Sequence, residues 1–179
     1  MYRMSILTML APSSLSKKLD IPHCTKMALV HDMAEALVGD ITPVDGVDKA
    51  EKNRRETETM DFLTGRLLGQ STGVMEQGKG LKEIWQEYED GMTLEAKFVK
   101  DIDKIELVLQ MMEYERKEDG KLDLGEFVWV AEKIQLEEVK SWCREILKER
   151  EDFWKRNGHK LEKVNGLDIG RKLLGPAEK

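Results

Sequence analysis

An adjacent histidine and aspartate, His31 and Asp32, interrupt residues 26–38, a stretch that is otherwise almost entirely apolar. Glu35 follows one helical turn later, and Asp40 comes just after the stretch ends. A buried imidazole or carboxylate must be paired or bound to a metal, because an unpaired ion costs several kcal/mol in a medium of low dielectric constant. These four side chains are therefore the first candidates for chemistry.

A metal bound by this stretch would need a ligand from elsewhere in the chain. On a continuous helix, His31 and Glu35 share one face and Asp32 points about 100 degrees away. A carboxylate from a later helix, such as Asp103, could complete a site that includes His31 and Asp32. Imidazole and carboxylate together suit zinc, manganese, iron or cobalt better than calcium. The alternative for His31 is a core histidine paired with a carboxylate.

The elements that must position these residues are predicted to be helices. Charged residues make up 36% of the 179 residues and aromatic residues 6%, and strand patterns are nearly absent. The fold class is therefore predicted to be all-α. Apolar spacing and capping residues predict helices over residues 1–11, 20–38, 48–68, 81–91, 93–118, 124–133 and 136–154. Residues 1–157 are predicted to form one domain, and residues 158–179 a partly ordered polar tail.

Charge and cysteine content exclude several classes of protein. A net charge of −6 gives no reason to expect binding to a nucleic-acid polymer. The two cysteines, Cys24 and Cys143, are too far apart for a zinc knuckle and indicate reduced, packed thiols. No apolar run is long enough to span a bilayer, and residues 1–12 lack the features of a signal peptide. We therefore expect no membrane partner and a cytosolic or nuclear location.

The helix over residues 48–68 alternates basic and acidic residues. Glu51 with Arg55, and Lys52 with Glu56, are spaced as ordinary i, i+4 pairs. Its basic residues could neutralise a phosphate group, but this alternation favours a solvated helix face.

An ordered set of residues resembles the HD-domain metal-dependent phosphohydrolases. The set comprises the doublet His31-Asp32 within residues 28–36, then Gly39-Asp40-Ile41-Thr42-Pro43, Glu51-Lys52 with Arg54-Arg55-Glu56, residues 97–100 leading to Asp103, and Glu113-Tyr114-Glu115. It is similar to the HD-domain-containing protein 2 branch, which is related to bacterial 5′-deoxynucleotidases. The resemblance covers residues 1–154.

The resemblance implies a helical HD-domain bundle that hydrolyses deoxyribonucleoside 5′-monophosphates to the deoxyribonucleoside and phosphate. It implies a divalent metal ion (Mn, Co, Zn, Fe or Mg) held by His31, Asp32 and Asp103. Glu35 and Asp40 match the acidic residues that the family uses around the attacking water and the leaving group. The family also implies a homodimer.

One metal-binding histidine of the family pattern has no counterpart in this sequence. In the family, the first metal-binding histidine directly precedes the residues that Met1 to Met4 resemble, and the sequence begins there. We expect this truncation to lower metal affinity and turnover. The alternative to the hydrolase is a non-catalytic helical module that keeps the HD scaffold and acts through dimerisation or partner binding. An active phosphohydrolase of another substrate, such as a cyclic nucleotide or a triphosphate, is a third hypothesis.

Overall fold

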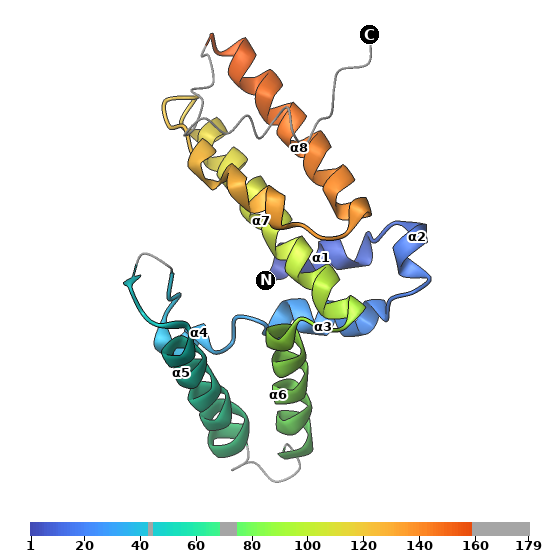
Figure 1. Cartoon of the computed structure of the whole chain (residues 1–179), viewed down its shortest axis with the longest axis vertical. Helices are drawn as coiled ribbons and strands as arrows, with labels where there is room; N and C mark the ends of the chain where they lie inside the picture. Colours follow the sequence, from blue (N-terminus) through green and yellow to red (C-terminus); the bar gives the residue numbers. More distant parts are fainter. Residues whose placement is uncertain (43–44, 69–74, 159–179) are drawn as a thin grey trace. The chain divides into compact units, whose positions relative to one another are not determined.

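A computed structural model describes residues 1–42, 45–68 and 75–158 of the chain, and every regular element within these ranges is a helix (Figure 1). This confirms the predicted all-α class. The chain divides into two compact units. The first unit contains Met1–Ala11 and Ser16–Val99, and the second contains Pro12–Leu15 and the chain from Lys100 onward. Most of the predicted tail lies outside the described residues.

The described part of the first unit contains five complete α-helices and the start of a sixth. The helices are α1 (Tyr2–Met9), α3 (Ile21–Val30), α4 (Glu35–Val38), α5 (Lys49–Asp61), α6 (Met75–Asp90) and the beginning of α7 (Leu94–Lys117). Asp20 caps α3 by accepting a hydrogen bond from the His23 N–H at 3.0 Å, as the sequence predicts. Thr93 caps α7 in the same way, with the Ala96 N–H donating at 3.1 Å.

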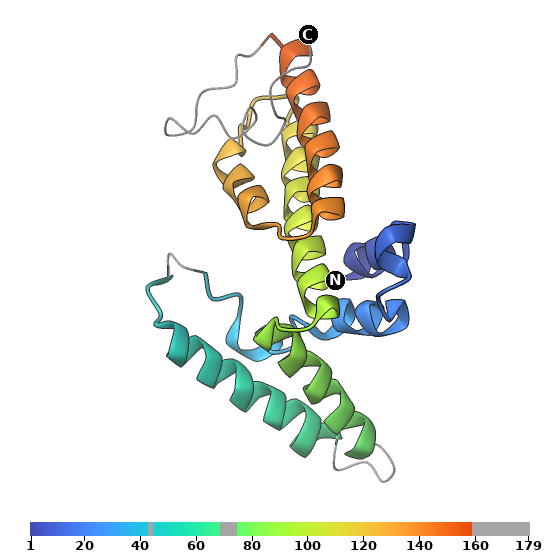
Figure 2. The ribbon, with the colours of Figure 1, turned by 45° about the vertical axis from the view of Figure 1, so that its right-hand side comes forward.

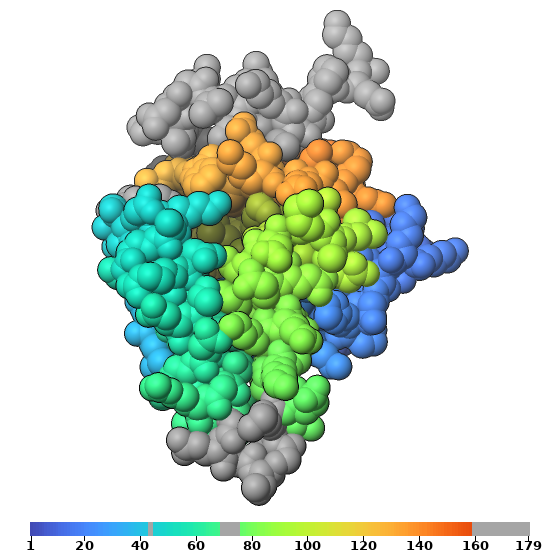
Figure 3. Space-filling model, turned by 60° about the horizontal axis from the view of Figure 1, so that its bottom comes forward, coloured from blue at the N-terminus to red at the C-terminus, as the bar shows by residue number. Residues whose placement is uncertain are grey.

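A small apolar cluster joins three elements of the first unit. Ala34, Met60 of α5 and Trp85 of α6 are buried together, and Met33 and Leu63 pack against them. Figures 1 and 2 show α5 and α6 as neighbours, and their outer surfaces adjoin in the space-filling view of Figure 3. The cluster therefore fixes the turn before α4 against both helices.

The helix predicted over residues 81–91 begins earlier than expected. A π-helical turn, Phe62–Leu67, extends α5, and α6 begins at Met75, six residues before the predicted start. A Cβ at Gly78 would lie 2.5 Å from the Thr64 carbonyl oxygen. This glycine therefore allows a close approach of two backbones, and does not mark a loop.

The second unit is built on the remainder of α7, a 3₁₀ helix, Gly125–Lys133, and α8 (Glu137–Arg156). Glu115 of α7 is fully buried, and its carboxylate accepts hydrogen bonds from the Arg150 guanidinium and the Trp154 indole of α8. The Arg150 Nη2 also donates to Asp123 Oδ1 at 2.7 Å. An ion network thus joins α7 to α8 inside the unit.

A second buried carboxylate holds the start of α8. Asp101 is fully buried and accepts hydrogen bonds from the backbone N–H groups of Gln135 and Leu136 at 2.8 to 3.0 Å. We expect Asp101→Ala to lower the free energy of unfolding by about 2 kcal/mol, because two backbone N–H groups at the start of α8 lose a buried acceptor. Urea denaturation monitored by circular dichroism measures this change. Loss of less than about 0.5 kcal/mol would contradict it.

Both cysteines are free and buried, as the sequence predicts. Burial raises the pKa of Cys143 to about 11 and, with the charges of Glu95 and Asp20, that of Cys24 to about 12. Since the thiolate is the reactive form, we expect iodoacetamide to label neither thiol in the folded protein at neutral pH. Mass spectrometry with and without urea checks this, and rapid native labelling would refute it.

Among the described residues, no helix combines the length and the apolar content that crossing a bilayer requires.

Candidate active site

The chain changes its backbone geometry at the histidine-aspartate doublet. The prediction of one helix over residues 20–38 is wrong here, because α3 ends at Val30 and residues 31–34 form a turn before α4. The Ala28 carbonyl accepts a hydrogen bond from the ring Nδ1 of His31 at 3.1 Å. The chain continues with bonds to the third residue back, such as Glu35 N–H to the Asp32 carbonyl.

This turn brings the imidazole and carboxylate of the doublet together. His31 Nε2 lies 3.0 Å from Asp32 Oδ1, and only 4% of the histidine surface is exposed. The helical spacing of 100 degrees therefore does not separate the two side chains. Because the ring Nδ1 donates to the Ala28 carbonyl, a neutral imidazole presents its Nε2 lone pair to the carboxylate.

A neutral imidazole and a carboxylate present two acceptor atoms to each other at this distance, and a proton or a metal cation between them would satisfy both. Neighbouring ligands at right angles around a metal, with bonds of about 2.1 Å, are separated by about 3 Å. The carbonyl bond to Nδ1 is also the arrangement that orients metal-binding histidines. The doublet therefore fits a divalent metal ion.

Glu35 has a perturbed ionisation equilibrium. Partial burial, followed by repulsion from Asp32 and Asp40, raises the pKa of its carboxyl to about 7. The side chain is half-buried, whereas Asp40, just beyond Gly39, is exposed. Gly39 has a φ of 76°, a conformation that favours glycine. A carboxyl that is half ionised near neutral pH can either accept or donate a proton during a reaction.

Two other helices contribute residues that the sequence did not assign to the site. The Tyr88 ring of α6 packs on His31 with a centroid distance of 4.9 Å and a tilt of 58°. Glu56 of α5 is buried, and Lys52 lies 3.5 Å from it. The spacing of Tyr88 with Trp85 and the other apolar residues of α6 indicates a packed face, but it carries no information about the partner across that face.

The exposed face of α5 agrees with the prediction of a solvated surface. Arg54 and Arg55 are both exposed and bind Glu51, with the Arg55 Nε 2.7 Å from Glu51 Oε1. Lys52 differs from them because its side chain is only 35% exposed.

Asp103, the predicted third ligand, lies on α7 in the second unit and is half-buried. Within the part of the chain that the structure describes, no group of three or more His, Cys, Asp or Glu side chains is placed to hold a metal. The assignment of Asp103 to the metal site therefore stays a prediction.

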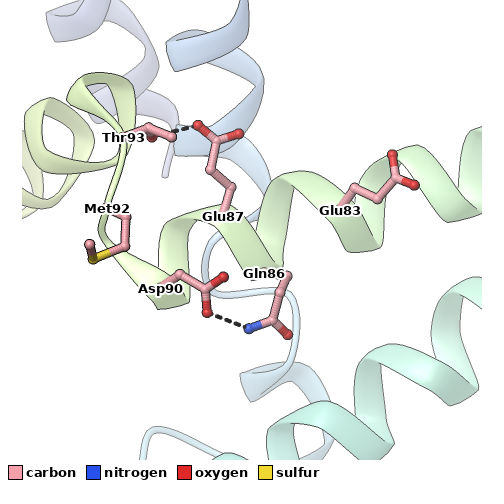
Figure 4. Close-up of a pocket in the computed structure, with 6 residues that line it drawn as sticks. All are labelled: Glu83, Gln86, Glu87, Asp90, Met92 and Thr93. Atoms are coloured by element: carbon pink, nitrogen blue, oxygen red, sulfur yellow. Dashed lines mark hydrogen bonds between the residues drawn. The ribbon is translucent and has the colours of Figure 1, made fainter.

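An open depression of about 300 Å³ lies at the end of α6 (Figure 4). Its lining residues are Glu83, Gln86, Glu87, Asp90, Met92 and Thr93. Glu87 is bound on both sides, by the Thr93 hydroxyl at 2.6 Å and by His23 Nε2 at 2.7 Å. The depression contains none of the predicted site residues, and two of its carboxylates, Glu87 and Asp90, are hydrogen-bonded to neighbouring side chains.

The chain is similar to known proteins of one family. A sequence model of the HD domain matches residues 1–142. The 5′-deoxynucleotidase hdd1 of Schizosaccharomyces pombe is 50% identical over 155 residues, which are 86% of this chain and 75% of that protein. The human 5′-deoxynucleotidase HDDC2 is 43% identical over 127 residues, which are 71% of this chain and 58% of that protein.

A solved structure is also similar. The HD domain-containing protein YGK1(YGL101W) superposes with a TM-score of 0.68 at 36% identity, over 86% of this chain and 76% of that one. The chain therefore spans between just under three fifths and about three quarters of the length of these relatives.

Proposed function

The chain belongs to the HD-domain family, and from this premise we propose that it is a metal-dependent 5′-deoxynucleotidase. The proposed reaction is hydrolysis of a deoxyribonucleoside 5′-monophosphate to the deoxyribonucleoside and phosphate. Relatives that carry this name, at 50% and 43% identity, support the proposal. The observation that carries it is the His31 Nε2 to Asp32 Oδ1 distance of 3.0 Å, which suits two ligands of one metal.

We assign His31 and Asp32 to the metal, with Asp103 as the third protein ligand on the basis of the family resemblance. A bound divalent metal lowers the pKa of a water ligand and neutralises charge on the phosphoryl oxygens. His31 supplies Nε2 because its Nδ1 is held by the Ala28 carbonyl. Manganese, cobalt, zinc, iron and magnesium remain the candidate ions.

Glu35 and Asp40 are the proposed acid and base groups. Hydrolysis forms a bond from water oxygen to phosphorus and breaks the bond from phosphorus to the 5′-oxygen. The attacking water loses a proton and the leaving 5′-oxygen gains one. With a pKa of about 7, Glu35 can accept the proton of the attacking water and donate the same proton to the leaving 5′-oxygen, and Asp40 is the neighbouring carboxylate proposed to act beside it.

The proposal is tested on the purified protein by metal analysis and by phosphate release. Deoxyribonucleoside and ribonucleoside 5′-monophosphates are assayed with added manganese or cobalt, and a cyclic nucleotide and a triphosphate serve as comparison substrates. We expect phosphate release with the deoxyribonucleoside monophosphates. A folded protein that binds no metal and releases no phosphate would instead support the non-catalytic HD module.

Glu35→Gln separates proton transfer from metal binding. We expect the kcat for phosphate release to fall at least about 10-fold, because the amide cannot exchange a proton at neutral pH. Manganese affinity, measured by calorimetry, should change little. Unchanged kcat across pH 5 to 9 would exclude Glu35 from the proton transfers.

A homodimer and a cytosolic or nuclear location complete the proposal. Both rest on the family resemblance and on sequence composition. Sedimentation velocity of the purified chain tests the dimer, and a monomer at all concentrations would exclude it.

A further inference from the structure

Lys52 of α5 lies beside the carboxylates of the candidate site. Its Nζ donates a hydrogen bond to the Ile41 carbonyl at 3.0 Å, and lies 3.5 Å from Glu56 Oε1. Ile41 directly follows Asp40 in the chain. The Lys52 ammonium therefore connects α5 to the segment that carries a proposed catalytic carboxylate.

The segment that carries Asp40, residues 39–42, is hydrogen-bonded at both of its ends. The Gly39 N–H donates to the Glu35 carbonyl at 2.8 Å, which closes α4. The Thr42 N–H and hydroxyl both donate to Asp45 Oδ2 at 2.7 Å. Both ends are thus bonded within residues 35–45, whereas the Lys52 bond joins the middle of the segment to another helix.

The charge of Lys52 also suits this position. Glu56 is only 6% exposed, and a carboxylate buried to this extent needs a nearby cation. Lys52 opposes the repulsion that Asp32, Asp40 and Glu56 exert on Glu35. The Lys52 ammonium thus opposes part of this repulsion, although the pKa of Glu35 remains raised.

We propose that Lys52 is a positioning residue for the candidate active site, and that it holds the Asp40 segment against α5 through the Ile41 carbonyl and Glu56. The kinetic part of this inference rests on the proposed hydrolase function, whereas the structural part does not.

Hydrogen exchange measured by mass spectrometry tests the structural part. In Lys52→Met, we expect the peptide containing residues 39–42 to exchange about 10-fold faster, because its link to α5 is lost. Lys52→Arg keeps a donor and a charge, and should exchange like the wild type. Lys49→Met, at an exposed lysine of the same helix, is the matched control.

Steady-state kinetics test the catalytic part. We expect Lys52→Met to lower kcat about 10- to 100-fold with KM within about 2-fold, because a small displacement of a catalytic group is costly. Lys52→Arg should restore most of kcat, and Lys49→Met should behave like the wild type. If Lys52→Met does not fold by circular dichroism, Lys52→Ala replaces it in both experiments.

The outcomes separate this inference from the proposed function. A rise in KM with unchanged kcat would mean that Lys52 binds the substrate phosphate, and unchanged exchange would mean that it holds no segment. Either result overturns the proposal. If the wild type releases no phosphate, the hydrolase proposal fails, and the exchange experiment alone decides the role of Lys52.

Discussion

His31→Gln and Asp32→Asn are each expected to reduce phosphate release from deoxyribonucleoside 5′-monophosphates by at least about 100-fold. Loss of a group that merely orients a metal ligand already costs about 10- to 100-fold in affinity or activity, and these substitutions remove the proposed ligands themselves. Manganese affinity, measured by calorimetry, should fall in parallel. Two variants are needed because His31 is buried, whereas the Asp32 side chain is 38% exposed and tolerates substitution better.

His23→Gln is the matched control for this experiment. His23 lies on α3, the helix that ends just before His31, and also faces a carboxylate, with its Nε2 2.7 Å from Glu87 Oε2, but its side chain is 30% exposed. We expect the control to keep its metal affinity and its kcat. If Asp32→Asn binds manganese as tightly as the wild type while folded, the doublet is no metal site and the hydrolase proposal loses its main support.

The largest loss of stability is expected from Arg150→Met in the second unit. Glu115 is fully buried and Arg150 is 7% exposed, with an Nη2 to Oε1 distance of 2.7 Å. Removing the guanidinium leaves the carboxylate charged and buried, which typically costs about 3 to 5 kcal/mol. For a chain of this size, the melting temperature should fall by roughly 10 °C. Differential scanning calorimetry measures it.

Arg116→Met is the matched control for the buried pair. The Arg116 Nη2 lies 2.7 Å from Glu149 Oε1 in an exposed pair, with the same contact distance as the buried one. Exposed pairs contribute about 0 to 1 kcal/mol, so the control should melt within a few degrees of the wild type. Similar melting temperatures for the two variants would show that burial does not determine how much the Arg150–Glu115 pair contributes to stability.

The sequence predicts the helices well where local signals suffice. The caps at Asp20 and Thr93 lie where their residue types indicate, because a capping bond involves only the next three residues. The resemblance to the HD-domain family is confirmed for the same reason, since an ordered set of motifs is readable without coordinates.

The features that the sequence missed depend on contacts distant in the chain or on a competing local bond. The break after Val30 arises because the His31 ring binds the Ala28 carbonyl, an alternative that apolar periodicity does not reveal. Residue types cannot predict the bond from Lys52 to the Ile41 carbonyl, since the backbone carbonyl of any residue can accept it. Buried Glu115 likewise resembles a surface glutamate until α8 packs on it.

The hydrogen bonds that Asp101 accepts at the start of α8 also help to hold the rotation of α7 about its own axis. Successive residues of a helix are turned by about 100 degrees, so Asp103 projects about 200 degrees away from Asp101. While Asp101 is bonded to the N–H groups of Gln135 and Leu136, Asp103 is aimed to the other side of the helix. The bonds of Asp101 therefore help to fix the direction in which Asp103 projects, two residues further along α7.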